Sequence, residues 1–220
     1  MRSQLVLLVG VTLGIGGLAQ AQTATGANSP ESRGYAEFVA HSAFGNAPSQ
    51  SYGAEFGLRI AKNLQAFAEG GRTSNVAPAT FGADAQTIAL YLQQTQSASV
   101  SFTAKEPITF GVAGLKYLIP TESKMEPYVL AGFGAARVKR NARFLVGGVD
   151  MTTSMASLGV VLGTGLSGSS TKPMLTLGGG LAWPLWQAVT IDFQYRFGRI
   201  LAGDRSVTTH LAGAGLGVRF

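Results

Sequence analysis

Residues 187 to 199 read QAVTIDFQYRFGR, and bulky apolar side chains alternate with small or polar ones along this stretch. Val189, Ile191, Phe193, Tyr195 and Phe197 share one parity, opposite Ala188, Thr190, Asp192, Gln194 and Arg196. Successive side chains of a β-strand point to opposite faces, so the pattern predicts a strand with one apolar and one charged face. Residues 51–60 repeat it, with Phe56 and Leu58 opposite Glu55 and Arg59. Strands of a membrane barrel and of a soluble sandwich both fit this pattern.

Working outward, similar segments separated by turn signals recur along the chain. The predicted strands are 34–44, 51–60, 64–73, 107–119, 126–138, 173–183, 187–199 and 207–220. In 64–73 the faces are ambiguous, because Phe67 shares parity with Gln65 and Glu69.

Connection lengths give an independent criterion, because bacterial barrels alternate short periplasmic turns with longer external loops. With a periplasmic N-terminus, the external connections are 45–50, 74–106, 139–172 and 200–206, and the periplasmic ones are 61–63, 120–125 and 184–186. The sequence therefore predicts an all-β fold, an eight-stranded antiparallel up-and-down transmembrane β-barrel with short periplasmic turns and long external loops.

Composition favours the membrane alternative. Hydrophobic residues make up 46% of the 220 residues and charged residues only 13%, with 30 glycines and no cysteine. After residue 21 no uncharged apolar stretch reaches the roughly 20 residues that a spanning helix needs, so the mature chain can cross a membrane only with strands. The net charge is +6. The distribution of the charged residues along the sequence favours an anionic membrane surface over nucleic acid as the partner.

The first residues have the layout of a cleaved secretory signal peptide. A short start containing Arg2 precedes an apolar core from Leu5 to Leu18, and Ala19-Gln20-Ala21 forms a cleavage site of small residues. We therefore expect a signal peptide over 1–21, a flexible periplasmic lead-in over 22–33 and the outer-membrane barrel over 34–220.

Two stretches in the long external connections have helix-like apolar spacing. They are 83–94 (ADAQTIALYLQQ) and 151–166. Each is compatible with a short helix packed on the barrel mouth or with a mobile surface loop, and the sequence does not separate these alternatives.

Charged residues at inward parity predict a filled lumen. They are Glu37, His41, Glu55, Arg59, Glu69, Lys116, Asp192, Arg196 and Arg219, whose signs nearly balance. An eight-stranded barrel is just wide enough for side chains to fill, and lone buried charges cost several kcal/mol each. We expect a network of hydrogen-bonded ion pairs across neighbouring strands rather than a wide channel.

Aromatic residues near the predicted strand ends suggest two belts at the membrane interfaces. The periplasmic belt comprises Tyr35, Tyr117, Tyr128, Trp183 and Trp186, and the external one Phe44, Tyr52, Phe110, Phe144 and Phe197. At the external rim, basic residues would meet the phosphates of lipopolysaccharide or simply solvent. They are Lys105, Arg137, Lys139, Arg140, Arg143, Lys172, Arg199 and Arg205.

Sites for catalysis, metals or cofactors are weakly indicated. Adjacent residues of a strand face opposite ways, so His41 cannot activate Ser42 directly. His210 is placed to approach His41 across the first and last strands, but no oriented serine or carboxylate accompanies the pair. Gly163, Gly165 and Gly168 have dinucleotide-loop spacing without the strand and helix that such a loop needs. We expect no catalytic, metal or cofactor site and no enzyme activity.

The C-terminal residues Leu216-Gly217-Val218-Arg219-Phe220 resemble the terminal signal of outer-membrane proteins, in which Leu216, Val218 and Phe220 would be the insertion signal. Further stretches resemble the outer-membrane protein β-barrel domain family, the group related to the transmembrane domain of outer membrane protein A. They are 52–59 (YGAEFGLR), 114–117 (GLKY), 126–134 (EPYVLAGFG), 177–180 (LGGG) and 192–199 (DFQYRFGR).

The resemblance covers residues 34–220 and implies an integral outer-membrane protein, assembled by the barrel assembly machinery with periplasmic chaperones. Outer membrane protein A carries a peptidoglycan-binding domain after its barrel, and the printed sequence does not continue past Phe220, so anchoring to the cell wall is not expected.

Three functional classes remain open. The leading hypothesis is a structural or surface-interaction barrel with a lumen largely filled by side chains, in contact with outer-membrane lipid and lipopolysaccharide. The alternatives are a narrow pore for small solutes or ions, and a lipid-modifying outer-membrane enzyme.

Overall fold

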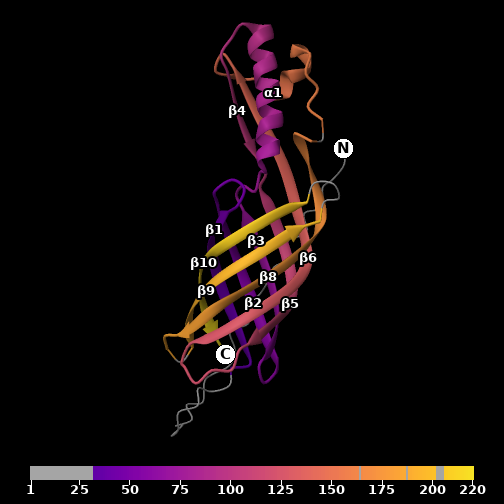
Figure 1. Ribbon diagram of the computed structural model, residues 1–220. Helices are drawn as coiled ribbons and strands as arrows, with labels where there is room; N and C mark the ends of the chain where they lie inside the picture. Colours follow the sequence, from indigo (N-terminus) through magenta and orange to yellow (C-terminus); the bar gives the residue numbers. More distant parts are fainter. Residues whose placement is uncertain (1–31, 164, 187, 202–205) are drawn as a thin grey trace, which may run out of the picture. The chain divides into compact units, whose positions relative to one another are not determined.

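A computed structural model describes residues 32–163, 165–186, 188–201 and 206–220. In this part of the chain, eight antiparallel strands close into a barrel in which neighbours in sequence are also neighbours in space (Figure 1). They are β1 (Gly34–Phe44), β2 (Ser49–Ala61), β3 (Leu64–Thr73), β5 (Ile108–Leu118), β6 (Glu126–Val146), β8 (Ser167–Pro184), β9 (Val189–Ile200) and β10 (Val207–Arg219). Pairing of β1 with β10 and of β6 with β8 closes the sheet. The predicted fold class is confirmed.

The barrel wall is built inside out compared with a soluble protein. Large apolar side chains such as Phe38, Leu177, Phe193 and Leu216 are about half exposed on the outer face. Charged residues and glycines alternate with them and face the lumen, as the parity of 51–60 and 187–199 predicts. Phe67, which the sequence left ambiguous, is buried in the lumen beside Gln65 and Glu69. No helix in the described residues has the length and hydropathy needed to cross a membrane.

The sheet continues beyond the barrel at one end. After β6 has parted from β5, its residues 141–146 pair with β4 (Val100–Lys105), and Leu145 and Val146 also pair with β7 (Val149–Asp150). Glu106 and Pro107 interrupt β4 and β5, where proline has no N–H to donate to a ladder. The predicted strands 126–138 and 173–183 are thus too short, because β6 reaches Val146 and β8 begins at Ser167.

Helix α1 (Ala79–Gln96) packs against β4 and gives this extension a core of its own (Figure 1). Phe81, Ala85, Ala89 and Leu92 repeat at three- and four-residue spacing and bury one face of the helix. They meet residues of β6 and of the 3₁₀ helix η1 (Thr152–Leu158), including Phe144 and Met155.

Of the two possible helices, 83–94 is therefore helical and longer than expected. Among the described residues of 151–166, only Thr152–Leu158 is helical, and it forms a 3₁₀ helix. We call α1, β4, residues 139–146 of β6, β7 and η1 the extension.

Candidate functional site

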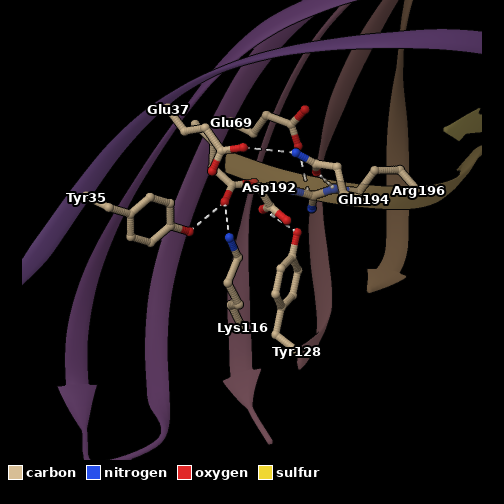
Figure 2. A network of polar contacts seen from close by, with 9 residues as sticks. Tyr35, Glu37, Glu69, Lys116, Tyr128, Asp192, Gln194 and Arg196 are labelled. Atoms are coloured by element: carbon tan, nitrogen blue, oxygen red, sulfur yellow. Dashed lines mark hydrogen bonds and ion pairs between the residues drawn. The ribbon is translucent and has the colours of Figure 1, made fainter. Parts of the chain in front are cut away.

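Strand register places three carboxylates side by side inside the barrel. Glu55 of β2 is directly opposite both Glu37 of β1 and Glu69 of β3. Like charges facing one another across strands destabilise a sheet, so this row needs cations from elsewhere. Other strands of the wall supply them, Lys116 from β5, the neighbour of β3, and Arg196 from β9 (Figure 2).

Glu55 is the centre of the resulting network. Its Oε1 accepts hydrogen bonds from the Tyr35 hydroxyl and from Lys116 Nζ, each at 2.5 Å, and its Oε2 pairs with Nη2 of Arg196. Glu55 as a whole residue is only 2% exposed. Three donors from three other strands therefore converge on one buried carboxylate, which links opposite sides of the barrel.

Arg196 extends the network toward the other carboxylates of the row. Its Nε donates to Gln194 Oε1 at 2.7 Å, and Gln194 Nε2 donates to Glu37 Oε1 at 3.2 Å. Its Nη1 lies 3.7 Å from Oε2 of Glu69, and its guanidinium carbon lies 5.6 Å from the centre of the Phe67 ring. A guanidinium over an aromatic face is attracted by the ring, which explains an apolar ring among these charges.

Lys116 lies between two tyrosine rings. Its Nζ is 4.4 Å from the ring centres of both Tyr35 and Tyr128. The Tyr128 hydroxyl donates to Asp192 Oδ2 at 2.6 Å, as Figure 2 shows. The two rings therefore hold the ammonium group in the lumen while their hydroxyls donate to Glu55 and Asp192.

The charges at the centre are less balanced than the sequence suggests. Glu37, Glu55, Glu69 and Asp192 are buried with only Lys116 and Arg196 as fully buried partners. Arg59 is half-buried at the end of β2, and Arg219 pairs with Glu126 through bonds of 2.8 and 2.6 Å at the turn end of the barrel. In the described residues, Asp192 Oδ1 and His41 Nε2 are buried without a hydrogen-bond partner.

The network divides the lumen. A cavity of about 30 Å³ on one side is lined by Tyr35, Glu37, Lys116 and Asp192. A cavity of about 10 Å³ on the other side is lined by Glu69 and Arg196. The larger has room for about two water molecules and the smaller for at most one, since a water needs on the order of 10–15 Å³. The lumen of this structure is thus filled by side chains between the two cavities.

The predicted rim residues fall into distinct environments. Lys105, Arg137, Lys139 and Arg199 are exposed, whereas Lys172 is half-buried at inward parity. Arg140 Nε lies 3.7 Å from the buried Glu106, and Arg143 Nε lies 3.1 Å from Asp150. Hydrogen bonds from Thr152 hold the pKa of the exposed Asp150 below its usual value, and Arg143 adds to this effect. Arg205 lies outside the described residues.

The predicted aromatic belts need correction. Tyr117, Trp183 and Trp186 are exposed on the outer side, but Tyr35 and Tyr128 are buried in the lumen network. Phe110 is buried in the barrel interior and Phe144 in the core of the extension. Closeness to a strand end does not place a ring in a belt, because residue parity decides which face of the strand the ring reaches.

The histidines do not approach each other. His41 faces the lumen and is 5% exposed. His210 lies on the outer face, stacked on Phe44 with its Nδ1 2.7 Å from the Tyr195 hydroxyl. Within the described residues, no group of three or more His, Asp or Glu side chains is arranged to hold a metal ion.

The C-terminal strand runs as predicted from the alternation. Leu216, Val218 and Phe220 are exposed on the outer face, and the Phe220 backbone N–H donates to the carbonyl of Gly34. The leader and most of the lead-in, residues 1–31, lie outside the described residues. The sequence reasoning also missed the outward Arg72 near the end of β3, whose even parity with Ala68 and Gly70 was a usable signal.

Comparisons with known proteins rest on structure alone. No protein-family profile matches the chain, and no curated protein matches it in sequence. Neisserial surface protein A is similar in structure, with a TM-score of 0.54 and 19% identity over 86% of this chain and 98% of that one.

Two further solved structures have lower scores. The N-terminal β-barrel domain of Pseudomonas aeruginosa OprF has a TM-score of 0.49 at 13% identity, over 86% of this chain and 98% of that one. Yersinia pestis Ail, the attachment invasion locus protein, has a TM-score of 0.44 at 15% identity, over 84% and 96%. At these identities the likeness concerns the fold, and by fold the chain is an integral bacterial outer-membrane β-barrel of the eight-stranded type.

Proposed function

We propose that this protein is a structural and surface-interaction barrel of the outer membrane, which presents the extension outside the cell and conducts little or nothing. The observation that carries the proposal is the buried Glu55–Lys116–Arg196 bridge, which spans the lumen between two cavities of about 30 and 10 Å³. A porin-like channel needs a continuous water path, which such a bridge interrupts.

The extension supports the surface-interaction half of the proposal. It has its own apolar core, so it is a folded projection rather than a loose connection. Leu90 and Tyr91 of α1 and Val149 of β7 are exposed on it. Folded loops held on a rigid barrel are a common place for binding residues.

Partners and activity follow from the same proposal. Lipid contacts the apolar outer rows, lipopolysaccharide contacts the basic rim, and the assembly machinery with periplasmic chaperones inserts the barrel. We assign no reaction to the protein.

The experiment is conductance of the purified mature chain in planar lipid bilayers. We expect no steady ion current from the wild type. The double variant Glu55→Ala/Arg196→Ala, which removes both sides of the central bridge, should give small, discrete openings. A steady wild-type current that survives further purification would overturn the closed barrel and favour the second candidate, a narrow pore. The two cavities that flank the bridge are the specific observation in favour of that candidate.

A further inference from the structure

Three cations gather on the outer face where the barrel meets the extension. Thr109 of β5 is directly opposite both Arg72 of β3 and Arg137 of β6, so these side chains form one cross-strand row. Strand spacing puts the Cα atoms of the two arginines about 10 Å apart. Lys139 lies two residues further along β6 and therefore on the same face. All three cations are exposed.

These cations line a groove of about 590 Å³ together with hydroxyl and amide groups of Ser167, Ser169 and Asn141. Arg137 Nη2 donates to Ser169 Oγ at 3.5 Å, which inclines the guanidinium toward β8. Nearby Arg140 and Arg143 are paired with Glu106 and Asp150. Within the described part of the chain, no carboxylate pairs with Arg72, Arg137 or Lys139. The groove is thus lined by three cations that have no carboxylate partner, beside Arg140, which has one in Glu106.

The next cross-strand row toward the short turns of the barrel has unusually small side chains on the outer face of the wall. Gly70, Gly111 and Ala135 form the neighbouring cross-strand row, and a Cβ placed on Gly111 would meet no atom within 4 Å. Ala68 and Ala113 continue the trough in the row beyond. It leads to a hollow of about 370 Å³ on the outer wall, which Ala54 and Ala68 line beside Phe38 and Phe56.

We propose that Arg72, Arg137 and Lys139 bind a phosphate group carried by a glycolipid of the outer leaflet, with one acyl chain of that lipid lying in the small-residue trough. The assignment rests on the proposed orientation, in which the extension is external. A phosphate monoester carries about −1.5 to −2 charges and takes several charge-assisted hydrogen bonds, which three unpaired cations can supply. A free phosphate would use the cations alone, whereas the adjoining apolar trough fits a phosphate attached to acyl chains.

The test uses the mature chain in phosphatidylcholine nanodiscs, titrated with bis-phosphorylated lipid A, with its dephosphorylated form and with inorganic phosphate. Replacing Arg72, Arg137 and Lys139 together by Gln should weaken binding of phosphorylated lipid A by at least tenfold, since each lost hydrogen bond to a charged group is worth about a factor of ten. The matched control replaces Arg33, Lys62 and Lys124 by Gln, which removes as much charge at the turn end of the barrel, away from the basic rim, and should change binding less than about twofold.

A second substitution tests the trough separately from the charges. Gly111→Phe has open space at its Cβ on the outer face, so its ring should fill the trough and weaken lipid A binding several-fold without altering the response to inorganic phosphate. Ala214→Phe, on β10 at the opposite wall of the barrel, is the matched control and should bind as the wild type does. Heat-dependent gel migration verifies that every variant is folded.

Three results would overturn the inference. The first is wild-type affinity for phosphorylated lipid A in the Arg72, Arg137 and Lys139 variant. The second is equal affinity of the wild type for phosphorylated and dephosphorylated lipid A. The third is binding of inorganic phosphate as strong as that of the lipid, which would make the groove a site for free anions. None of these substitutions touches the Glu55 bridge, so the groove and the closed lumen can fail independently.

Discussion

Glu55 shows at the level of single residues why the lumen charges are tolerated. A buried carboxylate is costly unless its oxygens are paired, and Glu55 accepts from Tyr35, Lys116 and Arg196. The three donors come from β1, β5 and β9, so the pairing also ties distant strands together. Loss of the Glu55 carboxylate should therefore lower the stability of the whole barrel.

We expect Glu55→Gln to lower the free energy of unfolding by about 3–5 kcal/mol, because Lys116 and Arg196 would stay buried without the carboxylate that directly bonds both of them. Urea unfolding of the chain from lipid vesicles measures this. Glu126→Gln is the control, since the side chains of Arg219 and Glu126 are 19% and 33% exposed and such a pair contributes about 0–1 kcal/mol. Equal losses in the two variants would refute a central role for Glu55.

The tyrosines of the network mark the limit of prediction at this scale. Alternation alone identified the buried Glu37, Glu55, Glu69, Lys116, Asp192 and Arg196. Tyr35 and Tyr128 fit in the lumen because each is paired with a glycine, Gly57 and Gly180, and a Cβ on either glycine would overlap the ring. The pairing of each tyrosine with its glycine depends on the register between two strands. That register cannot be read from the alternation of residues within one strand. Parity with Glu37 was nonetheless a readable signal for Tyr35.

At the level of elements, β6 explains why the barrel was easier to predict than the extension. Its apolar alternation ends near Val138, where Lys139, Arg140 and Asn141 follow, and the sequence prediction ended the strand there. The strand continues to Val146 because β4 replaces β5 as its partner. Beyond the apolar band the outer face no longer contacts lipid, so polar residues are tolerated there. The alternation of apolar and polar residues therefore becomes weaker.

Phe144 should hold the extension together independently of the barrel. It is fully buried against the α1 side of the extension and lies beside Phe102 of β4. Phe144→Ala should cost the extension about 3–5 kcal/mol and expose α1 and β4 to cleavage by a protease added outside intact cells, while the barrel fragment stays folded. Val149→Ala, at a side chain 61% exposed, is the control and should leave the extension resistant. Protection of both variants would show that this core does not hold the extension, or that it is not external.

At the level of the whole molecule, the wall separates two environments that only a membrane provides together. Charges, glycines and tyrosines fill the lumen, while leucines and phenylalanines cover the outside of the strands. Strand number, closure and the alternation of short and long connections follow from this arrangement, and the sequence predicts them because every strand repeats the same signal. The second core in the extension breaks that repetition, and its contents depend on tertiary contacts that no local pattern encodes.

A pair of equally exposed leucines tests whether lipid surrounds this wall. Leu177 in the middle of β8 is 54% exposed, and Leu185 in the following turn is 52% exposed. In water, arginine at either position would be tolerated alike. In a bilayer, Leu177→Arg should lower the free energy of unfolding by about 2–4 kcal/mol and Leu185→Arg by about 0–1 kcal/mol, because the cost of a lipid-facing charge is greatest at the midplane and falls toward the interfaces. Unfolding from lipid vesicles measures both losses, and the same small loss at the two positions would mean that the outer rows of the barrel do not face hydrocarbon.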